Sequence, residues 1–399
     1  MNEFTAVKEL SEKLLEDYKT ESSFFFTSPN RTILTEGEFT TVKHREIESF
    51  PELVQAVLCN AKQAGNPHPI VVGALPFDRR KEVQLIVPEH SRIAEKLQLE
   101  ATNEMKQNEK LTFKLTPVPD PEVYMNGVKQ GIKKIQDGDL NKIVLSRSLD
   151  VKSSEKIDKQ KLLRELAEHN KHGYTFAVNL PKDENENSKT LIGASPELLV
   201  SRNGMQVISN PLAGSRPRSD DPVEDKRRAE ELLASPKDLH EHAVVVEAVA
   251  AALRPYCHTL HVPEKPSVIH SETMWHLSTE VKGELKDLNT TSLELAIALH
   301  PTPAVCGTPM EEAREVIQEI EPFDREFFTG MLGWSDLNGD GEWIVTIRCA
   351  EVQENTLRLY AGAGVVAESK PEDELAETSA KFQTMLKALG LGDSSLNEK

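Results

Sequence analysis

Apolar residues recur along the chain with two spacings, which predict a mixture of helices and strands. Helical spacing occurs at 1–20, 50–64, 122–137, 158–169, 222–234, 236–253 and in a run that begins after Ser292. Strand-like runs occupy 22–34, 37–43, 69–78, 82–88, 141–151, 174–180, 190–193, 197–201, 205–208, positions near Ser267 and Val281, and a pair across 333–352. This irregular order favours an α+β fold over regular βαβ winding.

One segment interrupts this pattern. Thr116–Asp120 is rich in proline and is the best candidate for a linker between residues 1–115 and residues 116–390. A chain of 399 residues is long enough for two or three domains of ordinary size, but it also fits one large α+β unit. The segment therefore either separates two domains or joins two layers of one fold.

The stretch from Gly362 to Lys381 combines a glycine-rich segment with a charged helix. We predict a turn at Gly362 and Gly364, because glycine lets backbone N–H groups approach a ligand closely. In the helix that follows, Glu374, Glu377 and Lys381 share one face. Such a face can hold a divalent cation and an anion bound to it. The alternative is an ordinary solvated helix face.

A second acidic pair lies on the predicted helix 236–253. Asp238 and Glu241 are three residues apart and therefore share a face. Two helices that each offer two carboxylates suit Mg²⁺, which prefers oxygen ligands. Acidic helix faces are common, so spacing alone leaves both interpretations open.

Two apparent motifs do not support other functions. Asp336–Gly341 resembles the first half of a calcium-binding loop, but Ile347 stands where the loop needs a bidentate glutamate, and Asn338-Gly339 predicts a hairpin turn. Gly362–Ala367 has the spacing of a dinucleotide-binding fingerprint, but no βαβ unit surrounds it.

Two charged residues occur in apolar strands. Lys142 is either an exposed edge lysine or a buried amine that acts as a base. Glu197 precedes the run Leu-Leu-Val and is either a carboxylic acid with a raised pKa or the partner of an arginine.

Composition narrows the class of protein. The net charge is −18 and no basic block is present, so nucleic acid and anionic membranes are not expected partners. The four cysteines form no CxxC pair, the first residues do not resemble a signal peptide, and no apolar run reaches the ~18–20 residues of a membrane span. We therefore expect a cytoplasmic protein.

Taken together, the motifs resemble those of the chorismate-utilising enzymes, the family of anthranilate synthase component I. The matching stretches are LNKIVLSR, IGASPELLVSR, NPLAGSRPR, KDLHEHAVVVEAV, HPTPAVCGTP, EPFDREFFTGMLGW, WIVTIRCA and GAGVVAESKPEDELAET. They run from about 120 to 385, so the resemblance places the chorismate-binding catalytic region in 116–390, while 1–115 fits more loosely. It implies one integrated unit with a large β-sandwich core flanked by helices.

The resemblance implies a role for each motif residue. Lys142 is implied to be the general base that activates water for attack at C2 of chorismate, and Glu197 the general acid that assists loss of the C4 hydroxyl. The implied Mg²⁺ ligands are, directly, Glu241 and Glu377 and, through water, Asp238 and Glu374. Residues implied to contact chorismate are Gly214, Ser215, His276, Ala304, Phe328, Arg348, Gly362 and Lys381.

These contacts have distinct implied tasks. The Gly214-Ser215 amides and Lys381 would help Mg²⁺ to bind the ring carboxylate. Arg348 and the amides around Gly362 would receive the pyruvyl carboxylate, and the remaining residues would shape the ring pocket. Two carboxylates on the substrate require such local cations, because the protein as a whole is strongly acidic.

Within the family, the likeness is greatest to the isochorismate synthases of catecholate siderophore synthesis, which make a precursor of 2,3-dihydroxybenzoate. Relatives that use ammonia lack a lysine at the position of Lys142, and those with a nucleophilic lysine carry it where this chain has Ala213. Ala304 and Phe328 favour release of isochorismate over formation of salicylate and pyruvate.

Three alternatives stay open: a salicylate synthase, a menaquinone-pathway isochorismate synthase, and a silent relative that only binds an aromatic dianion or a partner subunit. We expect no obligatory amidotransferase, and a monomer is the simplest expectation for the oligomeric state.

Overall fold

The computed structural model describes residues 3–20, 24–44, 46–99, 111–181 and 188–392. Two large sheets form its centre, and every strand pairing among these residues is antiparallel. One sheet contains, in spatial order, β18 (Gly307–Thr308), β8 (Lys142–Ser153), β22 (Thr356–Val365), β21 (Cys349–Gln353), β10 (Thr190–Ser195), β9 (Tyr174–Asn179), β1 (Phe24–Thr27), β2 (Arg31–Glu36) and β6 (His90–Glu95). A further strand, β7 (Phe113–Val118), pairs with β8.

The second large sheet has its strands in the order β14 (Cys257–His261), β17 (Val281–Leu285), β12 (Gln206–Asn210), β11 (Leu198–Asn203), β20 (Gly341–Val345), β19 (Met331–Asp336), β4 (Ile70–Leu75), β5 (Val83–Val87) and β3 (Thr40–His44). A small third sheet consists of β13 (Leu212–Pro217), β16 (Met274–Ser278) and β15 (Ser267–His270).

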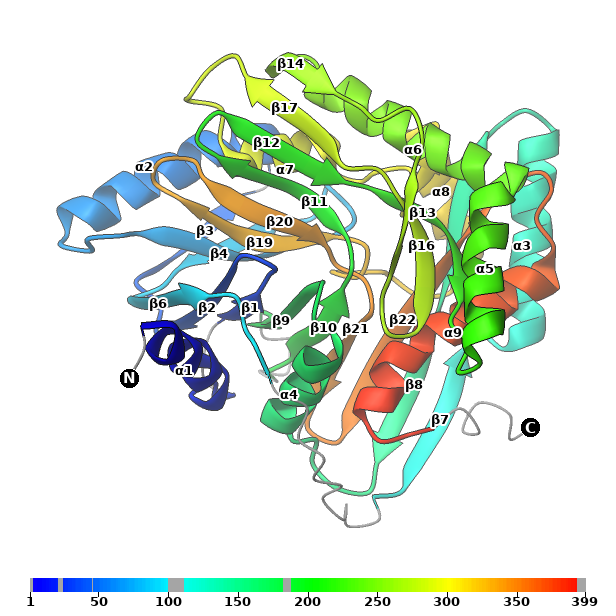
Figure 1. Cartoon of the computed structure of the whole chain (residues 1–399), viewed down its shortest axis with the longest axis horizontal. Helices are drawn as coiled ribbons and strands as arrows, with labels where there is room; N and C mark the ends of the chain where they lie inside the picture. The colour runs from blue at the N-terminus through cyan, green and yellow to red at the C-terminus, as the bar shows by residue number, and fades with distance from the viewer. Residues whose placement is uncertain (1–2, 21–23, 45, 100–110, 182–187, 393–399) are drawn as a thin grey trace.

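Helices cover the outer faces of this sandwich (Figure 1). They are α1 (Glu3–Glu16), α2 (Phe50–Gln63), α3 (Pro121–Gln136), α4 (Lys159–His169), α5 (Pro222–Ala234), α6 (Pro236–Leu253), α7 (Ser292–Leu299), α8 (Met310–Ile320) and α9 (Pro371–Ala388). None of the helices in the described ranges is long and apolar enough to cross a lipid bilayer.

The apolar core is divided between layers. Side chains of both large sheets, including Phe24, Phe26, Ile70 and Trp334, pack against one another between the sheets. Separate clusters join the first sheet to α1, α4 and α9, and the second sheet to α2, α6 and α7. The α+β prediction with a β-sandwich core is confirmed.

Four of the predicted helices begin after a side chain that caps their first turn. Ser235 accepts a hydrogen bond from the Asp238 amide at the start of α6, and a proline follows at the first helical position. Helix α4 begins after Asp158, which accepts a hydrogen bond from the Lys161 amide. The predictions for 222–234 and 236–253 are confirmed residue by residue.

Two predictions about local structure are wrong, and the candidate linker Thr116–Asp120 is partly a strand, because Thr116–Val118 pairs with Ser148–Asp150 as part of β7. The single strand predicted over 22–34 is a hairpin of β1 and β2 where it lies in the described residues. The predicted turn at Gly362 and Gly364 is part of β22, since both glycines pair with β8 in a continuous ladder.

Six strands in the described residues were not predicted, namely β6, β7, β13, β14, β16 and β18. Strands β13 and β16 matter most here, because they carry Gly214, Ser215 and His276. Their stability comes from pairing with one another, with Ser215 opposite His276, which local propensity does not reveal.

Candidate active site

Lys142 and Glu241 form a buried ion pair at the start of β8. The Lys142 Nζ lies 2.9 Å from Glu241 Oε1, and the lysine side chain is only 1% exposed. Lys142 is therefore not an exposed edge residue. Gly364 on β22 makes this approach possible, because a Cβ there would lie 2.1 Å from Glu241 Oε1 and 3.1 Å from Lys142 Cε.

Glu197 lies immediately before β11 and is 3% exposed. Its backbone amide donates to Ser195 Oγ, and its Oε1 accepts a hydrogen bond from the Leu212 amide at 3.4 Å. Burial raises the pKa of Glu197 to about 7, although that amide and the charges of Lys142, Lys381 and Arg348 oppose the rise. The carboxyl is therefore able to carry a proton near neutral pH.

Glu377 and Lys381 point from α9 toward the glycine-containing end of β22. Lys381 Nζ lies 2.6 Å from Glu377 Oε1 and donates to the Gly362 carbonyl oxygen at 2.8 Å. Ser215 Oγ donates to the same Glu377 oxygen at 3.0 Å. Burial opposes ionisation of Glu377, but Lys381, Lys237 and the Ser215 hydroxyl together outweigh it and lower the pKa of this carboxyl.

Asp238 and Glu374 lie one helical turn away from Glu241 and Glu377, and each has its own cation. Asp238 Oδ2 is 2.5 Å from Arg216 Nη2, and Glu374 Oε1 is 2.8 Å from Lys237 Nζ. Burial and repulsion from Glu377 raise the pKa of Glu374 to about 7. Sequence reasoning missed these cationic partners, because Arg216 and Lys237 lie outside the acidic patterns that it examined.

A metal site was predicted at these four carboxylates. No group of three or more His, Cys, Asp or Glu side chains in the described ranges is arranged to hold a metal ion. Mg²⁺ typically uses only one or two carboxylates and completes its shell with water and substrate oxygens. Glu241 and Glu377 both face one pocket and offer oxygen donors only, so their donor chemistry fits Mg²⁺.

Arg348 and His276 form the other side of this pocket. Arg348 is 5% exposed, has a left-handed backbone conformation with φ of 51°, and places Nη2 3.5 Å from His276 Nε2. Its Nε has no hydrogen-bond partner among the described residues. Burial and the Arg348 charge lower the pKa of His276, so this ring is neutral. Arg348 is therefore available to an anionic ligand.

An apolar wall completes the pocket. The Phe328 ring stacks on Tyr360, with a centroid distance of 4.9 Å, and Ala304 lies in the loop that precedes β18. All predicted site residues except Lys142, Asp238 and Glu374 line this pocket. Lys142 forms an ion pair with Glu241, which does line it. Tyr360 and Thr329 also line it and were not predicted, because neither belongs to a charged or glycine-rich pattern.

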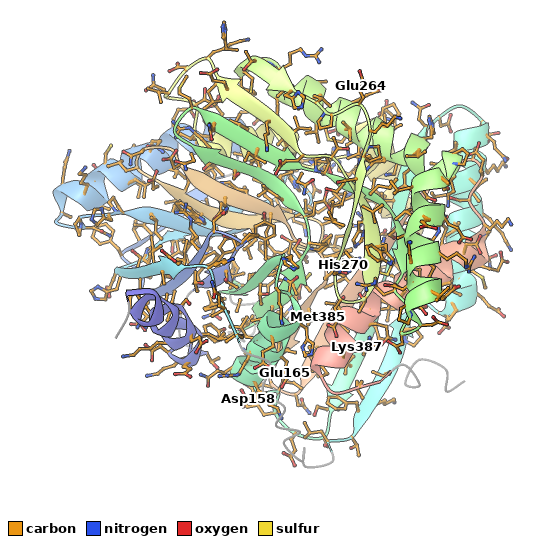
Figure 2. All side chains as sticks on the ribbon, in the orientation of Figure 1. Asp158, Glu165, Glu264, His270, Met385 and Lys387 are labelled. Atoms are coloured by element: carbon orange, nitrogen blue, oxygen red, sulfur yellow. The ribbon has the colours of Figure 1, made fainter. Side chains whose placement is uncertain are left out.

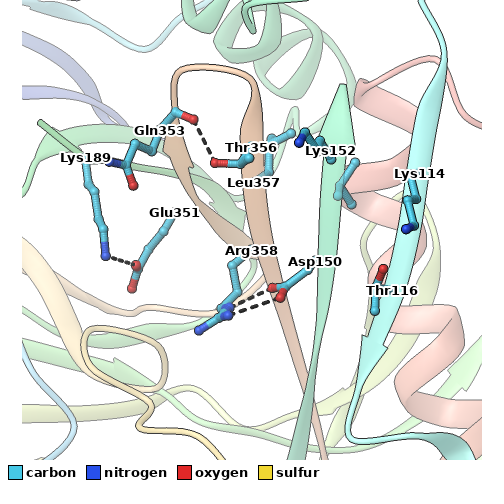
Figure 3. A pocket seen from close by; sticks show the side chains of 11 residues that line it. Lys114, Thr116, Asp150, Lys152, Lys189, Glu351, Gln353, Thr356, Leu357 and Arg358 are labelled. Atoms are coloured by element: carbon cyan, nitrogen blue, oxygen red, sulfur yellow. Dashed lines mark hydrogen bonds and ion pairs between the residues drawn. The ribbon is translucent and has the colours of Figure 1, made fainter. Parts of the chain in front are cut away.

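Arg348 also lines a second hollow. That hollow lies between the turn after β15, near His270, and the helices α4 and α9, which carry Glu165 and Met385 (Figure 2). A larger hollow lies on the open face of the first sheet, where Arg358 pairs with Asp150 and Lys189 with Glu351 (Figure 3). None of the predicted site residues lines this larger hollow.

The fold and the pocket agree with one class of protein. A sequence profile of the chorismate binding enzymes matches residues 1–390, so the chain belongs to this family. Isochorismate synthase DhbC of Bacillus subtilis (strain 168) is 60% identical over 386 residues, which cover 96% of this chain and 96% of that protein.

Solved structures extend the likeness. DhbC from Bacillus anthracis, a proposed 2,3-dihydroxybenzoate-specific isochorismate synthase, superposes with a TM-score of 0.93 at 90% identity and covers 96% of this chain and 100% of its own. The menaquinone-specific isochorismate synthase MenF of Escherichia coli gives a TM-score of 0.77 at 23% identity over 97% of this chain and 92% of its own. At that identity the second likeness shows a shared fold.

Proposed function

We propose that the protein is an isochorismate synthase that converts chorismate to isochorismate and supplies synthesis of a 2,3-dihydroxybenzoate siderophore. The observation that carries this proposal is the 60% identity to isochorismate synthase DhbC over 96% of both chains. The pocket supports it, because a dianionic ring compound needs cations at two places. Arg348, in the bend just before β21, and Lys381, on α9, offer them.

The reaction exchanges one hydroxyl for another. Lys142 acts as general base and takes a proton from the water that forms the new bond at C2, while the ring double bonds shift. Glu197 acts as general acid and protonates the C4 hydroxyl, which leaves as water. One water enters and one leaves, so the overall reaction is an isomerisation. The proton that burial keeps on Glu197 near neutral pH supports this role.

Glu241 is placed to contact both the proposed base and the proposed cofactor. Its Oε1 lies 2.9 Å from Lys142 Nζ, and its side chain lines the pocket together with Glu377. Binding of Mg²⁺ to Glu241 would therefore alter the contact that holds Lys142 in place.

Mg²⁺ is the proposed cofactor, held by Glu241 and Glu377 directly and by Asp238 and Glu374 through water. When bound, it would neutralise the ring carboxylate and hold it in place. Gly214 supports this assignment, because a glycine lets the backbone of β13 lie close to α6. Its φ is 77°, and a Cβ at this position would lie 3.0 Å from Asp238 Cβ. The Gly214-Ser215 segment then lies beside the carboxylates.

Ala304 and Phe328 favour release of isochorismate over elimination of pyruvate. The protein would need no amidotransferase subunit, since water and not ammonia is the proposed nucleophile. We further propose that it works as a monomer. Its four cysteines are free, and three of them are buried, which suits a reducing cytoplasm.

The decisive experiment is a product assay with purified protein and chorismate, in the presence of Mg²⁺ or EDTA, resolved by chromatography. We expect isochorismate that depends on Mg²⁺ and no pyruvate. Salicylate and pyruvate as main products would identify a salicylate synthase instead. Binding of chorismate without turnover would identify a silent relative.

Metal binding is tested separately from activity by thermal unfolding. Mg²⁺ should raise the Tm of the wild type, because a ligand that binds only the folded state stabilises it. Glu377→Ala should show a smaller rise and a loss of activity that excess Mg²⁺ partly restores. Glu372→Ala, an exposed carboxylate on the same helix, is the matched control. An equal Mg²⁺-induced rise in the wild type and Glu377→Ala would exclude Glu377 as a ligand.

A further inference from the structure

Strand β8 has an interrupted hydrogen-bonding edge beside the pocket. One edge pairs with β22 from Ile143 to Lys152 without a break. The other edge pairs with β18 at Lys142 and Ile143 and with β7 only from Ser148 onward. Between them, the Val144 amide still donates to the Cys306 carbonyl oxygen just before β18, but the Val144 carbonyl oxygen and the Ser146 amide lie beyond both strands.

Two charged side chains occupy this gap. Glu321 Oε1 accepts a hydrogen bond from the Ser146 amide at 2.7 Å, and Arg325 Nη2 donates to the Val144 carbonyl oxygen at 2.7 Å. The two side chains also form a forked ion pair, with Arg325 Nη2 2.5 Å from Glu321 Oε1 and Nε 2.8 Å from Oε2. Each side chain is 2% exposed. The pair therefore supplies the hydrogen bonds that a neighbouring strand would give.

Arg325 connects β8 to the opposite wall of the pocket. Its Nη1 donates to the Val305 carbonyl oxygen at 2.7 Å and to Thr329 Oγ1 at 3.3 Å. Val144, Val305 and Thr329 all line the pocket, whereas Glu321 and Arg325 do not. Arg325 thus contacts three residues that line the pocket, although its own side chain lies outside the pocket.

Stability alone is a poor explanation for this arrangement. A buried ion pair loses its hydration, and apolar replacements of similar volume are often as stable. What the pair provides is fixed geometry, because the guanidinium fork has rigid directions and its contacts reach two separate elements. Lys142 is two residues from Val144, and Ala304 precedes Val305.

We infer that Glu321 and Arg325 are positioning residues that hold the Lys142 end of β8 and the Ala304–Val305 loop at a fixed separation for catalysis. This inference rests on the proposed function. Among the described residues, no hydrogen bond or ion pair joins the pair to Arg348 or Lys381, the two cations proposed to bind the substrate carboxylates. Its loss should therefore lower kcat and leave the KM for chorismate nearly unchanged.

Arg325→Lys tests this directly, since it keeps the charge and removes the fork. Misplacement of a catalytic group by ~1 Å can lower the rate about 10²-fold, so we expect kcat to fall by about that factor, with KM within about threefold. Glu321→Gln should act in the same direction. The losses in the double variant should be less than the product of the single losses, because the two side chains act as one unit.

Arg202→Lys is the matched control. Arg202 is also a buried arginine, paired with Asp340 at 3.2 Å and bonded to the carbonyl oxygens of Asn338 and Leu288. It does not line the pocket. With rates expressed per folded molecule, measured by circular dichroism, this control should keep the wild-type kcat even if its Tm falls.

The outcomes are distinct. Absence of wild-type turnover would overturn the proposed function. Wild-type turnover with an unchanged kcat in Arg325→Lys, or an equal loss in Arg202→Lys, would overturn only the positioning role. If Arg325→Lys does not fold, Glu321→Gln decides by the same kcat and KM criterion. Failure of both to fold would also overturn the inference, because the pair would then be a requirement for folding.

Discussion

At the scale of single residues, the proposed chemistry depends on two buried ionisable groups whose surroundings differ. Lys142 stays close to the carboxylate of Glu241. Glu197 is surrounded by cations at longer range, yet burial still raises its pKa to about 7. Lys142 is therefore an amine in contact with a carboxylate, and Glu197 is an acid that keeps its proton near neutral pH.

Lys142→Met should lower kcat by about 10²–10⁴-fold, the usual contribution of a positioned general base. Methionine fills much of the same space, so the fold should persist, although Glu241 loses its partner and Tm should fall. Lys152→Met is the matched control, because Lys152 lies on the same strand but is exposed. Steady-state rates of the two variants would decide, and a wild-type rate for Lys142→Met would rule out its role as the base.

Glu197 should impose a pH dependence on both rate and stability. Its pKa rises from the ordinary value of 4.5 to about 7 in the folded protein, so the folded state keeps a proton that the unfolded chain has already released. The contribution of Glu197 to stability is therefore fully present below about pH 4.5 and is lost as pH rises to about 7, by roughly 3 kcal/mol in total. The rate should also fall above about pH 7, where the acid loses its proton.

Glu197→Gln should remove this contribution to the stability profile and stabilise the protein above pH 7 relative to the wild type. Its rate should fall by about 10²–10⁴-fold, because an amide cannot donate the proton. Denaturant unfolding at a series of pH values measures the first effect. If the free energy of unfolding changed with pH in the same way in the wild type and in Glu197→Gln, the pKa of Glu197 would not be raised in the folded protein, and this prediction would be wrong.

At the scale of elements, β22 shows how a tertiary contact changes the interpretation of a local pattern. Two glycines after an apolar run predict a turn, but the strand continues to Val365 because β8 pairs with it along its length. The glycines serve a different purpose: a Cβ at Gly362 would lie 2.6 Å from Ser146 Oγ, and one at Gly364 would meet Glu241. The spacing was visible in the sequence, whereas the groups that approach it were not.

Gly364→Ala should therefore damage the site more than the fold. The nearest atoms to the new Cβ belong to the end of the flexible Glu241 side chain, which can move away at small cost to stability. That movement separates Glu241 from Lys142, so we expect a loss of kcat of at least about 10²-fold with a small change in Tm.

Gly127→Ala provides the comparison for Gly364→Ala. In α3 its Cβ would lie 2.7 Å from Ile320 Cγ2, in an apolar contact that does not line the pocket. This variant should lower Tm and keep kcat. Paired measurement of Tm and kcat tests the argument, and a normal rate for Gly364→Ala would contradict it.

At the scale of the whole molecule, residues 1–115 contribute strands to both large sheets. β1 lies beside β9 in one sheet and β4 beside β19 in the other. Phe24, Phe26, Ile70 and Val72 from this part fill the core between the sheets. That the two parts fold as one unit stays a prediction, but its physical basis is clear: each part lacks the side chains that the other contributes to a shared core.

A fragment of residues 116–399 should fail to fold alone. Removal of β1 and β4 would expose the edges of β9 and β19 and a large apolar surface, which favours aggregation. Co-expression with residues 1–115 should restore solubility if the two parts complement each other. Circular dichroism and denaturant titration test this, and cooperative unfolding of the isolated 116–399 fragment would show that it is an independent domain.

The sequence by itself determined the α+β class, the helices with clear caps, the family and the set of candidate site residues. These features depend on local spacing and on motifs, both of which a linear sequence displays. Only the tertiary structure decided which charges meet. The partners Arg216 with Asp238, Lys237 with Glu374 and the pair of Glu321 with Arg325 beside β8 depend on the packing of separate elements. Burial, and with it the raised pKa of Glu197, is likewise a property of the assembled sandwich and of no segment alone.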